Sequence, residues 1–149
     1  MPRSRRNSNS LAEPKRDDLK VRQRKAVLAA VVKPETANRL GKDRVLDEMR
    51  GLARTAGVRV VDSLVQVRET PDTGTYLGKG KVEELKALVA RHGAELVVFD
   101  NNLSPSQGRN HEKELNVVIV DRSEVILDIF ASTARNYEAK LQVELAQLL

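Results

Sequence analysis

Four short apolar runs that alternate with helix-like stretches constrain the fold of this chain more than any other feature. The runs are rich in Val, Ile, Leu and Ala and cover residues 26–32, 58–67, 96–99 and 117–120. Helical patterns fill the intervals at 43–56, 82–92 and 105–115. Strands joined through single helices form parallel neighbours with right-handed crossovers. The sequence therefore predicts an α/β fold with a mostly parallel, four-stranded sheet and flanking helices.

A long helix is predicted after the fourth run, because residues 121–149 contain neither Gly nor Pro. Ser123 is the expected N-cap, and Glu124 suits the positive end of the helix dipole. Apolar residues recur along one stripe at steps of three or four: Phe130, Ala134, Tyr137, Leu141, Leu145 and Leu148. We expect this stripe to pack on the preceding domain, on another chain, or on a segment outside these 149 residues.

The positive charge is concentrated at the N-terminus. Residues 1–25 hold nine basic and three acidic residues, net +6, whereas the remaining 17 basic and 18 acidic residues give net −1. The sequence thus divides into a basic arm at 1–25, expected to be disordered in isolation, an α/β subdomain at 26–122 and the long helix at 123–149. The arm is either a solvated leader or a contact for RNA phosphates. Its candidate RNA-binding residues are Arg3, Arg5, Arg6, Lys15 and Arg16.

Composition argues against several classes of chemistry. The chain has no Cys and only two His, so disulfides, thiolate sites and a His-rich metal centre are not expected. No Ser–His–acid constellation suggests covalent catalysis. No apolar run approaches the roughly 20 residues of a membrane-spanning helix, and the basic N-terminus lacks the apolar segment of a secretion signal. We expect a soluble, cytoplasmic protein without a membrane partner.

Two aspartates end the third and fourth predicted strands, at the edge where open parallel sheets tend to bind ligands. As a functional pair, Asp100 and Asp121 could hold Mg²⁺ or a ribose hydroxyl. The interpretation we favour is that each accepts backbone N–H bonds in its own strand-to-helix turn.

A glycine-rich loop leads into the helix predicted at 82–92. It fails as a phosphate-binding P-loop because five residues separate Gly74 from Gly80, and because Val82 replaces the hydroxyl residue. The loop can still hold an anion at the helix N-terminus, or be a plain tight turn with two solvated lysines. The candidate nucleotide-binding residues are Gly78, Lys79, Gly80 and Lys81 of this loop, together with Asp100 and Asp121 at the carboxyl edge of the sheet.

The helix predicted at 105–115 is strongly polar. Ser104 as N-cap, Pro105 at the first position and Gln107 three residues later indicate a capping box. The polar side chains form either a solvated face or a recognition surface for RNA or a neighbouring domain. We expect His111 to face water, and His92 to cap the end of the preceding helix.

Five segments carry a resemblance to a known family. They are 76–81 (YLGKGK), 100–107 (DNNLSPSQ) with Arg109 and Asn110, 121–123 (DRS), 126–131 (ILDIFA) and 138–148 (EAKLQVELAQL). In this order and spacing they resemble the N-terminal region of HflX-type ribosome-associated GTPases over about residues 26–149. The chain departs from the family at His111, usually apolar there, and at Ser123, usually Thr.

The resemblance implies an α/β subdomain followed by two long helices in a hairpin, of which residues 123–149 are the first arm, and then a GTPase domain with the true P-loop. The GTPase domain would be a further partner of this chain where it is present, and it would use GTP and Mg²⁺. The chain itself is not expected to be an enzyme or to hold a cofactor. ATP binding at Gly78–Lys81 is the alternative function.

The resemblance also implies binding to the large ribosomal subunit and ribosomal RNA, with dissociation of ribosomes under stress. Besides the arm, the candidate contacts are Gln107, Arg109, Asn110, Arg135 and Lys140. We expect a monomer, with self-association through the long helix as an alternative.

Overall fold

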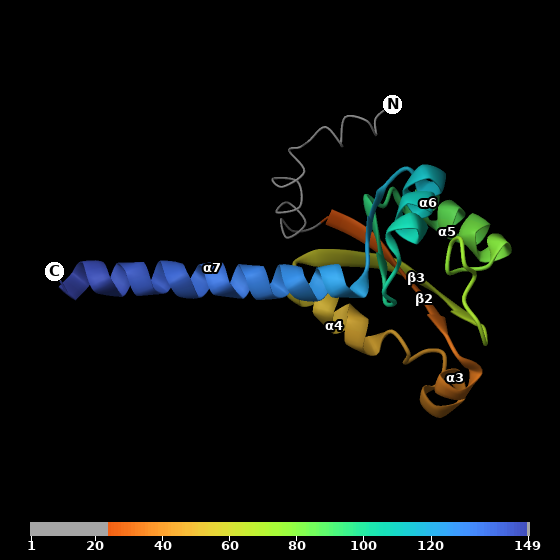
Figure 1. Ribbon diagram of the computed structural model, residues 1–149, viewed down its shortest axis with the longest axis horizontal. Helices are drawn as coiled ribbons and strands as arrows, with labels where there is room; N and C mark the ends of the chain where they lie inside the picture. The colour runs from red at the N-terminus through yellow and green to blue at the C-terminus, as the bar shows by residue number, and fades with distance from the viewer. Residues whose placement is uncertain (1–23, 149) are drawn as a thin grey trace.

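The computed structural model describes residues 24–148 and contains the predicted sheet. Its strands are β2 (Arg24–Val32), β3 (Val58–Val67), β4 (Leu96–Phe99) and β5 (Val118–Val120), arranged in the order β3-β2-β4-β5. Figure 1 labels β2 and β3, which lie side by side. Every neighbouring pair is parallel. The predicted α/β fold is therefore confirmed, with the first strand beginning two residues earlier than expected.

Each crossover contains the expected helix. These helices are α4 (Asp47–Thr55), α5 (Lys79–His92) and α6 (Pro105–Leu115), and α7 (Arg122–Leu148) follows the last strand. The sequence did not reveal α3 (Pro34–Leu40), a short helix after β2. It begins on Pro34 and ends at Gly41, which has a φ of 88°, and it buries no residue. A helix without an apolar face lacks the periodic pattern on which sequence prediction depends.

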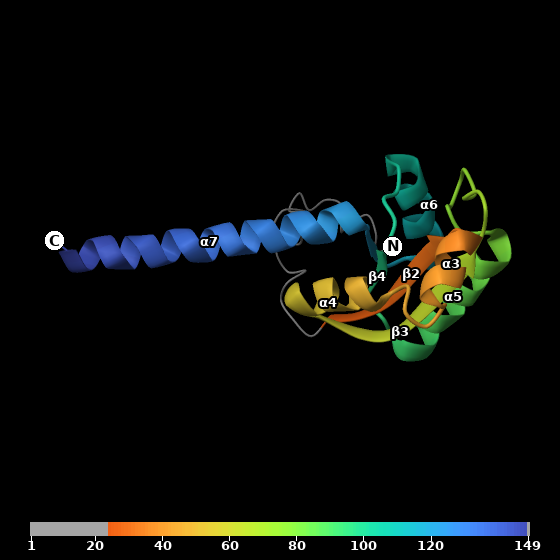
Figure 2. The same cartoon turned by 90° about the horizontal axis from the view of Figure 1, so that it is seen from below.

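Two apolar layers cover the two faces of the sheet. Alternate residues of β2 point to opposite sides, so Ala26, Leu28 and Ala30 pack with α4 and the start of α7. Val27, Ala29 and Val31 pack with α5 on the other face. The central strand is thus buried on both sides, which explains why its apolar run is continuous. Figure 2 shows α4 and α5 on opposite sides of the strands.

α7 projects away from the α/β body for most of its length (Figures 1 and 2). Val125 is its only buried residue among those described, and Leu141, Leu145 and Leu148 are 40%, 58% and 80% exposed. The α/β body therefore does not cover the apolar stripe of α7. Of the three partners expected for this stripe, the preceding domain is ruled out, and another chain or a segment outside these residues remains. None of the described helices is long and apolar enough to cross a membrane.

Candidate functional site

The carboxyl edge of β4 and β5 carries the first predicted site residue, Asp121, at the start of α7. Its Oδ1 accepts the N–H of Glu124 at 3.0 Å, while its own N–H donates to Oε1 of Glu124 at 3.0 Å. This reciprocal pair is a capping box, so the N-cap is Asp121 and the prediction of Ser123 is wrong. The spacing D-x-x-E was the signal for it. Because Oδ2 accepts the N–H of Leu103 at 3.0 Å, both oxygens of Asp121 serve backbone turns.

Asn101 and Asn102 form hydrogen bonds that stabilise the same edge of the sheet, although the sequence alone did not suggest a role for either residue. Asn101 donates to the carbonyl of Val31 at 3.0 Å and accepts its N–H at 2.9 Å, as a neighbouring strand residue would. Asn102 Oδ1 accepts from the N–H and the hydroxyl of Ser123, at 3.1 and 2.7 Å. Together these side chains attach the 100–103 turn to β2 on one side and to α7 on the other.

Asp100 is paired with an arginine that is itself shared between two carboxylates. Arg122 Nη1 lies 2.5 Å from Asp100 Oδ1, and Arg122 Nη2 lies 2.9 Å from Oε1 of Glu48 on α4. Burial raises the pKa of Asp100, an effect that the guanidinium opposes only in part. The hydrogen bond with Glu48 is the main reason that the pKa of Arg122 is raised. This triad connects the end of β4, the first turn of α7 and the first turn of α4.

The Gly78–Lys81 loop lies apart from that triad, at the start of α5. Gly78 is the N-cap without a side-chain cap, and its N–H donates to Gln66 Oε1 at 2.8 Å. Arg68 is close, since a Cβ built on Gly78 would lie 2.8 Å from its Nη1. Lys81 is engaged with Glu84 at 3.1 Å, and Lys79 and Gly80 are exposed. The positive helix end and Arg68 suit an anion, but the contacts of the described residues do not bring Asp100 or Asp121 into this loop.

The polar face of α6 does not simply face water, because it binds the 72–75 loop that precedes α5. Gln107 donates to the carbonyl of Thr73 at 3.2 Å, Asn110 donates to the carbonyl of Gly74 at 2.7 Å, and His111 contacts the carbonyl of Thr75. Two of the three candidate RNA contacts on α6 are thus occupied within the fold. Arg109, the third, is exposed.

His111 is fully buried, and the prediction that it faces water is wrong. Its Nε2 must carry the proton because a carbonyl can only accept, and its ring lies 4.7 Å from that of Phe99. Burial lowers the pKa of this imidazole, which is therefore neutral at pH 7. Nδ1 is buried without a hydrogen-bond partner among residues 24–148. The helical period alone could not show this, because the partner is a loop 36 positions earlier.

His92 also differs from its prediction, because its side chain does not cap α5. Nε2 lies 2.8 Å from Oδ2 of Asp62 on β3, and α5 is instead closed by Gly93 in the left-handed conformation, with a φ of 62°. A backbone bond from Ser63 is the main reason that the pKa of Asp62 is lowered. This pair ties α5 to the edge strand.

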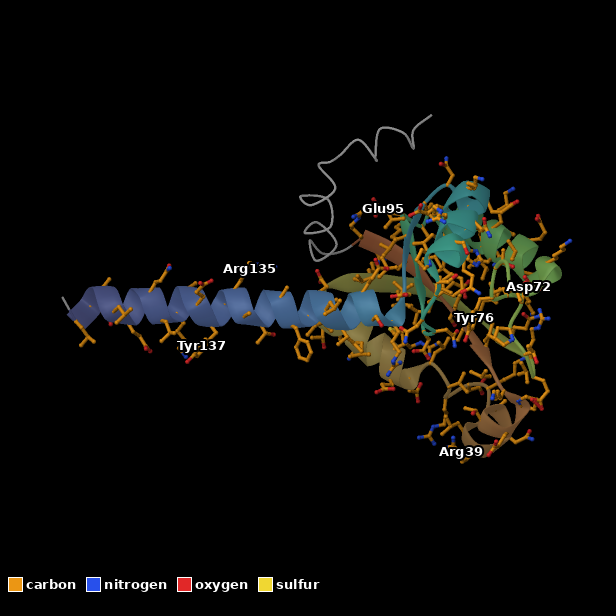
Figure 3. The ribbon with its side chains drawn as sticks, in the orientation of Figure 1. Arg39, Asp72, Tyr76, Glu95, Arg135 and Tyr137 are labelled. Atoms are coloured by element: carbon orange, nitrogen blue, oxygen red, sulfur yellow. The ribbon has the colours of Figure 1, made fainter. Side chains whose placement is uncertain are left out.

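The remaining candidates for RNA contact are scattered. Arg135 and Lys140 are exposed on the projecting part of α7, and Figure 3 shows Arg135 pointing away from the helix there. Arg3, Arg5, Arg6, Lys15 and Arg16 lie outside the described residues. Within residues 24–148, no three His, Cys, Asp or Glu side chains are grouped to hold a metal ion.

Comparison with protein families gives a match over residues 43–131 to the family described as "GTP-binding GTPase N-terminal". Among curated proteins, "GTPase HflX" of Alkalihalophilus pseudofirmus is 47% identical over 106 residues, which are 71% of this chain and 25% of that protein. "GTPase HflX" of Lacrimispora saccharolytica is 46% identical over 131 residues, 88% of this chain and 30% of that protein. The chain thus spans about a quarter to a third of the length of these relatives.

"GTPase HflX" of Escherichia coli is 44% identical over 103 residues, 69% of this chain and 24% of that protein. Among solved structures, the "crystal structure of SsGBP and GDP complex" matches with a TM-score of 0.57 at 25% identity. That match covers 83% of this chain and 34% of the solved one.

Proposed function

Because the chain belongs to the HflX family of GTPases and contains its N-terminal domain, we propose that it binds the large ribosomal subunit through ribosomal RNA. GTP hydrolysis, with GTP and Mg²⁺ as cofactors, belongs in this proposal to a full-length protein such as the relatives, of whose length the chain covers about a quarter to a third. That protein would act in the cytoplasm, dissociating ribosomes under stress.

The observation that supports the proposal is the projecting part of α7. Arg135 and Lys140 are exposed there, together with the apolar side chains of Tyr137, Val143 and Leu145. A helix that extends from its domain with both cations and apolar groups exposed is suited to enter a groove lined by phosphates and bases. The basic segment 1–25 would add phosphate contacts through counterion release.

We expect cosedimentation of the chain with large ribosomal subunits to fall steeply as salt rises from about 50 to 200 mM. The double variant Arg135→Gln/Lys140→Gln should weaken binding at low salt, and the slope against log salt should fall by about one for each phosphate that is no longer neutralised. Arg39→Gln/Lys42→Gln is the matched control, because it removes two positive charges from exposed positions, and Figure 3 shows Arg39 on α3 at the far end of the body. Equal binding by all three proteins would remove α7 from the interface.

Nucleotide binding at the start of α5 is the second candidate, favoured by the uncapped helix end beside Arg68. With Asp100 and Asp121 engaged elsewhere, the site would consist of Gly78–Lys81 and Arg68 alone. Calorimetry should then show heat with ATP, and less with Lys81→Ala. Glu84→Gln, which removes the partner of Lys81, should bind at least as tightly as the unaltered chain. Absence of heat with both ATP and GTP would contradict this function and leave ribosome binding untouched.

A further inference from the structure

A pocket of about 400 Å³ lies between the C-terminal end of α4 and α7, outside both candidate sites. One wall is formed by Thr55, Ala56 and Gly57. The wall from α7 consists of Asp128, Ile129, Ser132, Thr133 and Asn136. Figures 1 and 2 show α7 passing beside this end of α4.

The chemistry of the pocket suits a cation with several N–H donors. Asp128 supplies a carboxylate, and three hydroxyl side chains and one amide supply further acceptors. The C-terminal end of a helix carries partial negative charge on its last carbonyl groups, and α4 ends here. Among the described residues, no Lys, Arg or His lines the pocket. An arginine or lysine side chain is the group that these acceptors would hold.

The chain itself brings such side chains to the rim. Arg24, the first residue of β2, pairs with Val58, which directly follows the lining residue Gly57. The 23 residues before Arg24 contain seven Lys and Arg against three acidic residues, net +4. Two residues of extended chain span at most about 7 Å, so the segment that precedes Arg24 joins the described residues close to the pocket.

We propose that the basic segment 1–23 docks on this pocket, with one of its cationic side chains set against Asp128. The contact lies within one chain and does not depend on ribosome binding. It would hold the C-terminal end of the segment against α4 and α7. RNA phosphates would compete with Asp128 for the same side chains.

Limited trypsin digestion of the full chain tests the proposal, because a docked segment is protected from cleavage after its Lys and Arg residues. Asp128→Asn should raise the rate of cleavage within 1–23 about threefold, the scale expected for loss of one ion pair. Glu138→Gln is the matched control, since it removes the same charge from an exposed position on α7 and should leave the rate unchanged.

Ser132→Arg guards against a folding defect in Asp128→Asn, because it keeps the carboxylate and fills the pocket with a competing cation. It should accelerate cleavage as well. Rates equal to that of the unaltered chain in both pocket variants would overturn the proposal. Protection that grows with protein concentration would also overturn it, because the occupant would then come from a second copy.

Discussion

Replacing Arg122 with Met is expected to lower the free energy of unfolding by about 3 kcal/mol. The guanidinium is the cation that faces Asp100, whose side chain is 16% exposed, so the substitution leaves a largely buried carboxylate without its partner. Removal of one member of a buried ion pair costs more than the pair contributes, because the other charge stays desolvated. Loss of the bond to Glu48, which is 73% exposed, adds little.

A double-mutant cycle with Asp100→Asn isolates this effect in chemical denaturation. Asp100→Asn should recover most of the loss in the Arg122→Met background. In the single variant the folded pKa of Asp100 is raised further above its unfolded value, near 3.9. Its destabilisation should therefore shrink as pH falls toward 4, where the carboxyl is protonated. The control variant Arg135→Met, on the exposed part of α7, should have a free energy of unfolding within about 0.5 kcal/mol of that of the unaltered chain. Additive effects of Arg122 and Asp100 would contradict the coupling.

Acidification from pH 7 to pH 5 is expected to destabilise the fold through His111. The pKa of His111 is lower in the folded state than in the unfolded state. The contribution of His111 to the free energy of unfolding is therefore fully present above about pH 6.5 and is lost as pH falls. One such proton changes the free energy of unfolding by at most about 1.4 kcal/mol per pH unit. The negative charge of Glu114 on α6 acts in the opposite direction, but burial outweighs it, so the pKa of His111 stays lowered.

His111→Leu should flatten that pH dependence in thermal melts between pH 7 and pH 5. At pH 7 it should cost about 1 kcal/mol, because the carbonyl of Thr75 loses its donor. His92→Gln is the matched control, since it removes the other histidine of the chain, at the surface pair with Asp62, and should keep the downward slope. A slope that survives in His111→Leu would show that another group titrates.

Local patterns in the sequence predicted the fold well. The capping box of Ser104 and Gln107 is present, because its partners are three residues apart and compete with little else. Asp121 and Ser123 were both chemically able to cap α7, and the prediction failed because it weighed Ser123 without the reciprocal bond from Glu124. The presence of a helix could thus be predicted from the sequence. The choice between two neighbouring N-cap residues required both hydrogen bonds of the capping box to be considered.

Most of the site depends on contacts between distant segments, and for that reason could not be predicted. Asn101 acts as an extra strand residue only because β2 lies beside it, 70 positions earlier in the chain. The donors of α6 became internal because the 72–75 loop folds onto them, and a polar helix with its partner 36 positions away has the same sequence pattern as a solvated one.

The anchoring of α7 has a mechanical consequence. The helix is held through the capping box, Arg122, Ser123 and Val125, and Ile129 packs against the core, all within about its first two turns, while its 27 residues extend over about 40 Å. A rotation of about 10° at that base would move Leu148 by about 7 Å. A change in the contacts of Arg122 with Asp100 or Glu48 that tilted the base of α7 would therefore displace the far end of the helix much more than the base itself.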